Sequence, residues 1–325
     1  MRIPIALLLS SMGLLIACTS PSNDAGQVDS TPAVPSQDLG SFQVFPSDNP
    51  WNTDISAYPV HIHSDAYIAS IGVNGHVHPD FGTVWDRAPI GIPYVIVDSN
   101  TPLKAIAFDY ADESDVGPYP IPDSIRIEGG SSSTGDRHIL MIDTTAHKLY
   151  EVWHAYPPGH SENPSKTAWF GGSGAIFDLT SNTLRPEGYT SADAAGLPIF
   201  PGLVRYDEAV TKGAILHALR FTVNHSQQAY IHPATHQAGE STDANLPPMG
   251  LRLRLKASVD TAGYSPEVRV IMQALKKYGM IVADNGSDWY ISGAPDSRWN
   301  DEHLAELSQL QGSDFEAVET GALHY

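Results

Sequence analysis

Short runs of alternating apolar and polar residues, separated by turns rich in glycine and proline, recur through the middle of the chain. A period of two places successive side chains on opposite faces of a β-strand. In residues 251–256, leucine alternates with arginine and lysine. Residues 139–142 and 148–155 flank the polar segment 143–147, which predicts a β-hairpin. The chain is therefore expected to consist mainly of β-strands.

Helical patterns are confined to the last part of the chain. Ser265 and Pro266 suit the N-cap and the first position of a helix that Gly279 is placed to end. A second helix is expected from about Asn300 to Gln311. Long strands with a few late helices favour an antiparallel β-sandwich or jelly roll over a βαβ fold, with an α+β arrangement as the alternative.

A polar stretch near the N-terminus separates a short apolar segment from the predicted domain. Residues 18–40 contain almost no large apolar side chain, which is typical of a flexible tether. Residues 41–325 contain no further linker of this kind and no internal repeat, and they are expected to form a single β-rich domain. Cys18 is the only cysteine, so this domain must fold without a disulfide and cannot use thiol chemistry.

Residues 1–17 have the features of a signal peptide. Arg2 is followed by an apolar segment that is too short to span a bilayer. The segment ends in Leu-Ile-Ala-Cys at positions 15–18, which resembles the lipobox of bacterial lipoproteins. This resemblance implies cleavage before Cys18 and a membrane anchor made by acylation of its thiol. An ordinary secretory signal with a chance cysteine is the alternative.

The lipobox resemblance also implies where the protein works. Thr19 rather than aspartate follows the cysteine, which implies the outer membrane if the host is Gram-negative. The domain is therefore expected in the bacterial cell envelope, lipid-anchored and outside the cytoplasm. The body from about Asn49 to Trp299 is similar to secreted bacterial proteins of no known activity, and that resemblance implies no catalytic residue.

The charge balance and the absent motifs exclude several classes of function. The formal net charge is −19, and nucleic acids or anionic lipid surfaces would require a positive face. The P-loop, the dinucleotide-binding glycine motif and the His-Glu-x-x-His motif are absent. Residues 171–175 approach the serine-hydrolase elbow, but Ala175 replaces its second glycine. We interpret Ser173 as part of a tight turn.

The predicted hairpin brings together the most informative side chains. If residues 144–147 form its loop, then His138 lies opposite Trp153, and both share one face of the sheet with Glu151. This combination is common in sugar clefts, where the carboxylate acts as acid, base or nucleophile and the tryptophan stacks on a sugar ring. Alternatively, Glu151 pairs with a neighbouring basic residue and Trp153 belongs to the core.

Further candidates lie on a long loop and on one strand. Residues 184–207 are punctuated by glycine and proline, and such loops often bind ligands. Arg185 and Arg205 could hold a carboxylate or sulfate of an acidic sugar, or pair with the excess acids. Asp193 is a candidate second carboxylate for hydrolysis. His217, on the same strand as Arg220, is either a buried acid–base group or a hydrogen-bonded core histidine.

Two patterns could bind metal ions. Asp109, Asp112 and Asp115 precede a proline-rich turn, and either a calcium site or a solvated loop would explain them, although their spacing does not match an EF-hand. Histidines recur in pairs, but no acidic residue completes a familiar zinc-ligand spacing. These pairs are His61 with His63, His76 with His78, and His232 with His236.

Taken together, these features predict an envelope-anchored enzyme that acts on polysaccharide, either a glycoside hydrolase or a polysaccharide lyase. The alternative is a non-catalytic surface lipoprotein that binds a glycan or another extracytoplasmic ligand. The catalytic candidates are Glu151, His138, His217 and Asp193, and the substrate-binding candidates are Trp153, Arg185, Arg205 and Arg220.

Overall fold

The computed structural model describes residues 36–86 and 88–325. The predicted signal peptide, Cys18 and the predicted tether as far as residue 35 lie outside the described residues. Strands account for 25% of the described residues and helices for 16%, which confirms the mainly β class. None of the described helices is both long enough and apolar enough to cross a membrane.

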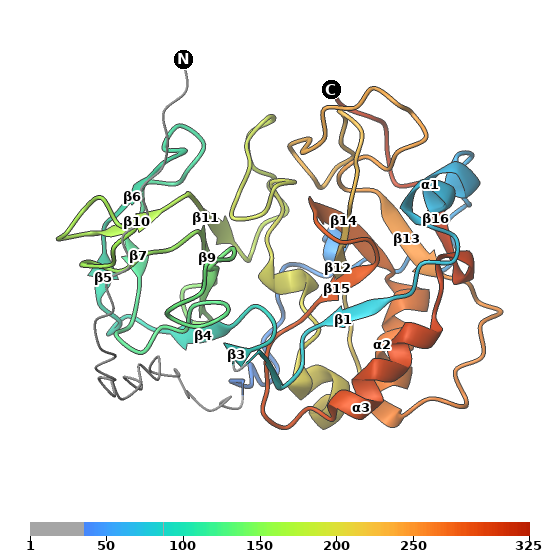
Figure 1. Ribbon diagram of the computed structural model, residues 1–325, viewed down its shortest axis with the longest axis horizontal. Coiled ribbons are helices and arrows are strands. Elements are labelled where there is room, and N and C mark those ends of the chain that lie inside the picture. Colours follow the sequence, from blue (N-terminus) through green and yellow to red (C-terminus); the bar gives the residue numbers. More distant parts are fainter. Residues whose placement is uncertain (1–35, 87) are drawn as a thin grey trace, which may run out of the picture.

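The chain forms two lobes that lie side by side (Figure 1). The first lobe is built around a four-stranded sheet in the order β11-β9-β8-β4, with the two-stranded sheets β10-β6 and β5-β7 beside it. Its strands are β4 (Tyr94–Val97), β5 (Leu103–Lys104), β6 (Ile106–Phe108), β7 (Tyr119–Pro120), β8 (Ile139–Asp143), β9 (Lys148–Trp153), β10 (Trp169–Gly171) and β11 (Ser173–Asp178).

The second lobe is built around a six-stranded sheet in the order β1-β15-β12-β14-β13-β16, and β2 and β3 form a separate pair. These strands are β1 (His78–Asp80), β2 (Val84–Trp85), β3 (Ala88–Pro89), β12 (Leu219–Val223), β13 (Arg252–Leu255), β14 (Met280–Asn285), β15 (Tyr290–Ser292) and β16 (Phe315–Val318). The helices are η1 (Pro50–Asn52), α1 (Ser64–Ile71), η2 (Phe200–Gly202), η3 (Asp207–Lys212), α2 (Pro266–Lys277), α3 (Asp301–Leu304), η4 (Ala305–Gln309) and η5 (Gly312–Asp314).

The hairpin β8–β9 forms with the predicted register. Leu140 pairs with Glu151, and Asp143 pairs with Lys148. The Asp143 side chain accepts hydrogen bonds from two backbone N–H groups of the loop, at 2.9 and 2.8 Å, which closes the turn. Leu140 packs into the main core, whereas Ile139 packs into a smaller cluster on the other face of the sheet. The strand is therefore buried on both faces.

Both larger sheets are mixed, which a purely antiparallel sandwich would not be. β4 runs parallel to β8, and β12 runs parallel to β14. Parallel neighbours require a long crossover connection, and the chain between β12 and β14 supplies it through β13 and α2. The predicted sandwich or jelly-roll arrangement of the sheets stays a prediction.

The two predicted C-terminal helices differ in outcome. The first, α2, begins at Pro266 as expected, and Gly279 follows it in the left-handed region at φ 68°. The second is not one continuous α-helix, because α3 gives way to the 3₁₀ helix η4. Its inward-facing leucines are spaced by three residues, which matches the 3₁₀ repeat of three residues per turn. These leucines are Leu304, Leu307 and Leu310.

Candidate functional site

Polar side chains form a row on one face of the six-stranded sheet. In the pairing of β1 with β15, His78 lies opposite Tyr290 and Asp80 lies opposite Ser292. Paired residues in a sheet project to the same face. Arg220 on β12 continues the row, because its Nη1 atom donates to Ser292 Oγ at 2.7 Å. Asp80, Ser292 and Arg220 therefore line up across three strands.

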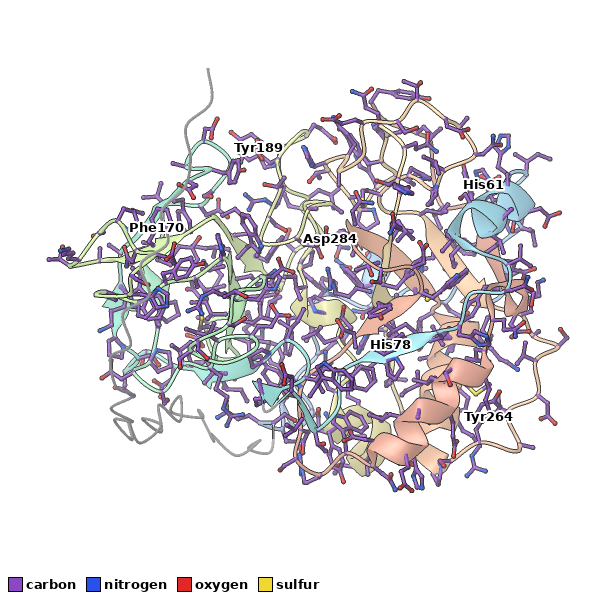
Figure 2. The ribbon with its side chains drawn as sticks, in the orientation of Figure 1. His61, His78, Phe170, Tyr189, Tyr264 and Asp284 are labelled. Atoms are coloured by element: carbon purple, nitrogen blue, oxygen red, sulfur yellow. The ribbon has the colours of Figure 1, made fainter. Side chains whose placement is uncertain are left out.

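A bulge in β14 adds Asp284 to this face. The register between β12 and β14 shifts by one residue after Phe221, so that Thr222 pairs with Asp284. Without the extra residue, Asp284 would project from the opposite face, because side chains alternate along a strand. With it, Asp284 Oδ2 lies 3.9 Å from Arg220 Nη2. Figure 2 labels Asp284 near the middle of the molecule, where the lobes meet.

Asp193 is the buried partner of Arg220. Its Oδ2 atom accepts hydrogen bonds from Arg220 Nε at 3.1 Å and Nη2 at 3.0 Å. Asp193 lies between β11 and η2, on the long loop that the sequence singled out. Both side chains are almost fully buried, so removing Arg220 would leave Asp193 as an unpaired charge in the protein interior.

The first lobe contributes His138, Glu128 and Asp136, which lie on the segment leading into β8. His138 Nδ1 lies 2.6 Å from Glu128 Oε2, and His138 Nε2 lies 3.0 Å from the carbonyl oxygen of Ala192. Both partners are acceptors, so both ring nitrogens carry hydrogen and the imidazole is cationic. Burial alone would lower the pKa of His138, but the Glu128 carboxylate raises it to about 9.

We call these ionisable residues the junction cluster, because both lobes and the loop between them supply it. It comprises Asp80, Glu128, Asp136, His138, Asp193, Arg220 and Asp284. Burial raises the pKa of Asp284 to about 7, and the charge of Asp193 adds to this effect. The protein groups packed around the Asp80 carboxyl partly shield it from water, which raises its pKa, and the charges of Glu128 and Asp136 raise it further. Asp80 nevertheless stays exposed to solvent, and Asp284 is partly exposed.

Glu151, the first catalytic candidate, lies beneath the junction cluster and has no exposed surface. Its carboxylate accepts hydrogen bonds from the backbone N–H groups of Ile199, at 2.8 and 3.1 Å, and of Phe200, at 2.8 Å. Burial raises its pKa to about 7, against the lowering effect of these two donors. Glu151 therefore anchors the loop that carries Asp193, and its carboxyl group is not accessible to a substrate.

Trp153 connects the hairpin to the junction cluster. Its indole Nε1 donates to Asp136 Oδ1 at 3.2 Å, and its ring stacks on His154 with centroids 5.0 Å apart. A Cβ atom at Gly172 would lie 2.2 Å from the Trp153 ring, so glycine at this position makes room for the indole. Trp153 stays partly exposed and thus presents an apolar surface beside Asp136.

Three other predicted site residues lie away from the junction cluster. Arg185 Nη1 lies 2.7 Å from Asp115 Oδ2, and its other nitrogens bond to backbone carbonyls. Arg205 Nη2 lies 2.7 Å from Glu208 Oε1, and His217 Nε2 lies 3.0 Å from Glu208 Oε2. These side chains are nearly buried and are each paired with a carboxylate of the protein. Their surroundings therefore match the structural roles that the sequence left open as alternatives.

The calcium candidates are not brought together. Asp115 pairs with Arg185, and within the described ranges Asp109, Asp112 and Asp115 do not form a group that could hold a metal ion. Glu128, Asp136 and His138 do form such a group, with ligand atoms within 4.8 Å of one another. Both nitrogens of His138 are already hydrogen-bonded to oxygens, so these three residues fit an ion-pair network better than a metal site.

A surface pocket of 490 Å³ lies elsewhere on the first lobe. Its titratable lining residues are Lys104 and Asp123, whose charged atoms lie 3.8 Å apart at the surface. A loose surface ion pair of this kind contributes little energy, and the pocket does not bring two carboxyl groups together. The junction cluster is therefore the better candidate for acid–base chemistry.

The sequence did not single out Asp80, Glu128 or Asp284. Asp80 and Asp284 lie on short strands far apart in the chain, and only sheet pairing and the bulge bring them onto one face. Comparison with protein-family models, with curated proteins and with solved structures finds no match to this chain. The geometry of the junction cluster is accordingly the basis for a functional proposal.

Proposed function

We propose that the junction cluster is the acid–base site of a glycoside hydrolase. One observation carries the proposal: Asp80 and Asp136 come from different lobes, are both exposed, and interact electrostatically. Their surroundings differ, because partial shielding from water and neighbouring charges raise the pKa of Asp80, whereas Asp136 accepts a hydrogen bond from Trp153. Two carboxyl groups in different environments can divide the acid and base roles of hydrolysis.

The roles follow from these surroundings. Asp80 donates its proton to the glycosidic oxygen as the bond to the sugar breaks. The Asp136 carboxylate takes a proton from the attacking water, whose oxygen bonds to the anomeric carbon. Trp153 provides an apolar face on which a sugar ring can stack beside Asp136. Buried Arg220 and cationic His138 balance the negative charge of the surrounding carboxylates.

Hydrolysis fits the junction cluster better than the lyase reaction does. A polysaccharide lyase requires a positive group that is free to neutralise the uronate carboxylate of its substrate. The two cations of the junction cluster are buried and already paired, Arg220 with Asp193 and His138 with Glu128. A substrate carboxylate would have to displace a partner from a buried ion pair, which is costly.

Asp80→Asn tests the proposal on the whole chain. We expect it to lower the rate of reducing-sugar release from a cleaved polysaccharide roughly 100-fold or more, because asparagine cannot donate the proton. Asp136→Asn should have a comparable effect. Asp123→Asn is the matched control, because that side chain is 96% exposed and remote from the cluster. An unchanged rate for Asp80→Asn on a proven substrate would overturn the assignment.

Glycan binding without cleavage is the second candidate function. It is favoured by the aromatic side chains beside Trp153, namely exposed Tyr110 on one side, at 6.4 Å between ring centroids, and partly exposed His154 on the other. Such a strip can bind a sugar chain by stacking alone. Saturable polysaccharide binding that Trp153→Ala abolishes, with no release of sugar, would favour this function over hydrolysis.

We also propose that lipid on Cys18 holds the protein in the bacterial envelope, as the lipobox resemblance implies. Cys18→Ser should prevent incorporation of labelled palmitate and shift the protein from the membrane fraction to the soluble fraction. Thr19→Ser is the control, because it leaves the cysteine in place. A Cys18→Ser chain that still sediments with membranes would contradict the proposed anchor.

A further inference from the structure

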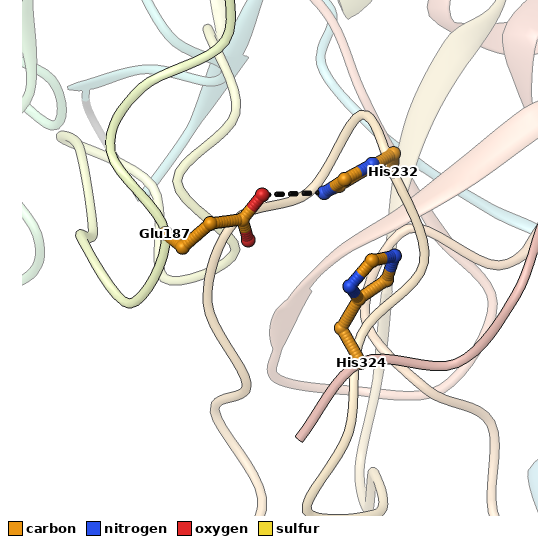
Figure 3. A group of neighbouring side chains, drawn as sticks. All are labelled: Glu187, His232 and His324. Atoms are coloured by element: carbon orange, nitrogen blue, oxygen red, sulfur yellow. Dashed lines mark hydrogen bonds and ion pairs between the residues drawn. The ribbon is translucent and has the colours of Figure 1, made fainter.

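Glu187, His232 and His324 gather at the surface of the second lobe, far from one another in the sequence (Figure 3). The potential ligand atoms of these three side chains all lie within 4.8 Å of one another. His232 Nε2 lies 2.7 Å from Glu187 Oε1, and the two histidine rings stack with centroids 4.1 Å apart. The sequence pattern suggested His232 and His236 as a pair. In the structure, the His236 ring is instead hydrogen-bonded to the carbonyl oxygen of Ala194.

The backbone holds two of these residues close together. Tyr230 and His324 exchange two backbone hydrogen bonds, at 3.0 and 2.8 Å, so the segment carrying His324 lies against the segment carrying His232. The Tyr230 hydroxyl donates to Glu187 Oε2 at 2.6 Å and so orients the carboxylate. Metal ligands are typically held in place by such outer partners. The three side chains are therefore positioned before any ion binds.

From this geometry we infer that Glu187, His232 and His324 bind a divalent transition-metal ion such as Zn²⁺. Two imidazole nitrogens and one carboxylate oxygen are a ligand set that zinc accepts, whereas calcium and magnesium prefer oxygen ligands alone. Zinc bonds of about 2.0–2.2 Å require the ligand atoms, which now lie within 4.8 Å of one another, to move closer together and the two stacked rings to tilt. Rotation of these side chains at the surface supplies both movements. Solvent fills the remaining coordination position, because Glu187 is exposed.

The bound ion joins three segments that are separate in sequence. Glu187 lies on the loop that precedes Asp193, His232 lies in the connection between β12 and β13, and His324 lies beyond β16. Coordination would therefore tie the segment after β16 to the loop that runs between the lobes. The inference is independent of the proposed hydrolysis, because none of the three residues belongs to the junction cluster.

The test is a Zn²⁺ titration of the whole, metal-free chain in detergent, in competition with a chromophoric chelator. We expect saturable binding of one ion per chain. His324→Ala and Glu187→Gln should each weaken binding by more than tenfold, and Tyr230→Phe roughly tenfold, because it removes only the outer partner. Replacement of Zn²⁺ by Co²⁺ should give the visible absorbance of a four- or five-coordinate site in the unaltered chain.

His303→Ala is the matched control. His303 also faces a carboxylate, with 2.7 Å between its Nδ1 and Glu267 Oε1, but this pair belongs to no three-residue group among the residues described. Its loss should leave Zn²⁺ affinity unchanged. Circular dichroism checks that each variant is folded, and the Co²⁺ spectrum tests the site without any substitution. Absence of saturable binding by the unaltered chain, or equal affinity in folded His324→Ala, would overturn the inference.

Discussion

At the scale of single residues, Glu151 combines a carboxyl group with complete burial. Its folded-state pKa is raised from 4.5 to about 7, so the folded protein binds this proton more tightly than the unfolded chain does. The stability that this group contributes is present below about pH 4.5 and is lost as the pH rises through about 7. The folded state should therefore weaken toward neutral pH because of Glu151.

Glu151→Gln should reduce this pH dependence. Glutamine resembles the protonated carboxyl group in shape and keeps one oxygen for the backbone donors. The free energy of unfolding of the variant should therefore fall less than that of the unaltered protein between pH 4.5 and pH 7. Urea denaturation at several pH values measures the difference, with Glu162→Gln as an exposed control. Parallel stability curves for Glu151→Gln and the unaltered chain would refute the prediction.

The sequence predicted the part of the candidate site whose residues are close together in the chain, and it missed the residues that are far apart. His138 and Trp153 belong to one hairpin, whose register follows from its loop, so alternation alone placed them on a shared face. Asp80 reaches the junction cluster only because β1 pairs with β15 at the edge of the second lobe's sheet. Asp284 reaches the same face through a bulge, and a bulge leaves no mark in the apolar pattern.

At the scale of elements, the β8–β9 hairpin depends on one side chain for its turn. Asp143 is buried, and its Oδ1 accepts hydrogen bonds from the backbone N–H groups of Thr145 and Ala146, which lie in the exposed part of the turn. Asp143→Ala should therefore lower the free energy of unfolding by about 1–2 kcal/mol, because two hydrogen bonds that close the turn are exchanged for bonds to water. Urea denaturation measures this change.

Asp98→Ala provides a comparison for Asp143→Ala, because Asp98 also accepts a backbone hydrogen bond in a turn, from Asn100, but its side chain is exposed whereas Asp143 is buried. Its effect should be smaller. Equal effects of the two substitutions would mean that the Asp143 turn does not hold the hairpin.

Helix prediction shows what periodicity can and cannot settle. The pattern of α2 marks one apolar face over three turns, and tertiary packing agrees with it. The leucines from Leu304 to Leu310 repeat every three residues. This spacing is compatible with one face of an α-helix, but it matches the three residues per turn of a 3₁₀ helix better. α1 is short, and it buries Tyr67, Ile68 and Ile71 on the face that lies against β16.

At the scale of the whole molecule, one apolar core passes through both lobes. It includes Leu140 and Leu149 from the first lobe, Ile199 from the connecting loop, and Leu253 and Ile281 from the second lobe. A core shared in this way couples the stability of the lobes. If one lobe unfolds, the apolar side chains of the other lobe that pack against it become exposed to water. The length of the chain was compatible with one compact unit and with two lobes. Length does not show whether two lobes share a core.

The two lobes should accordingly unfold together. Leu140 is fully buried in the shared core, and Leu140→Ala should lower the free energy of unfolding by about 2–5 kcal/mol. The loss should appear equally in far-ultraviolet circular dichroism and in tryptophan fluorescence, because Trp169 reports from the first lobe and Trp289 from the second. Val116→Ala is the control, since Val116 is 86% exposed. Two separate transitions, with only one of them shifted by Leu140→Ala, would show that the lobes are independent units and that the shared core does not couple them.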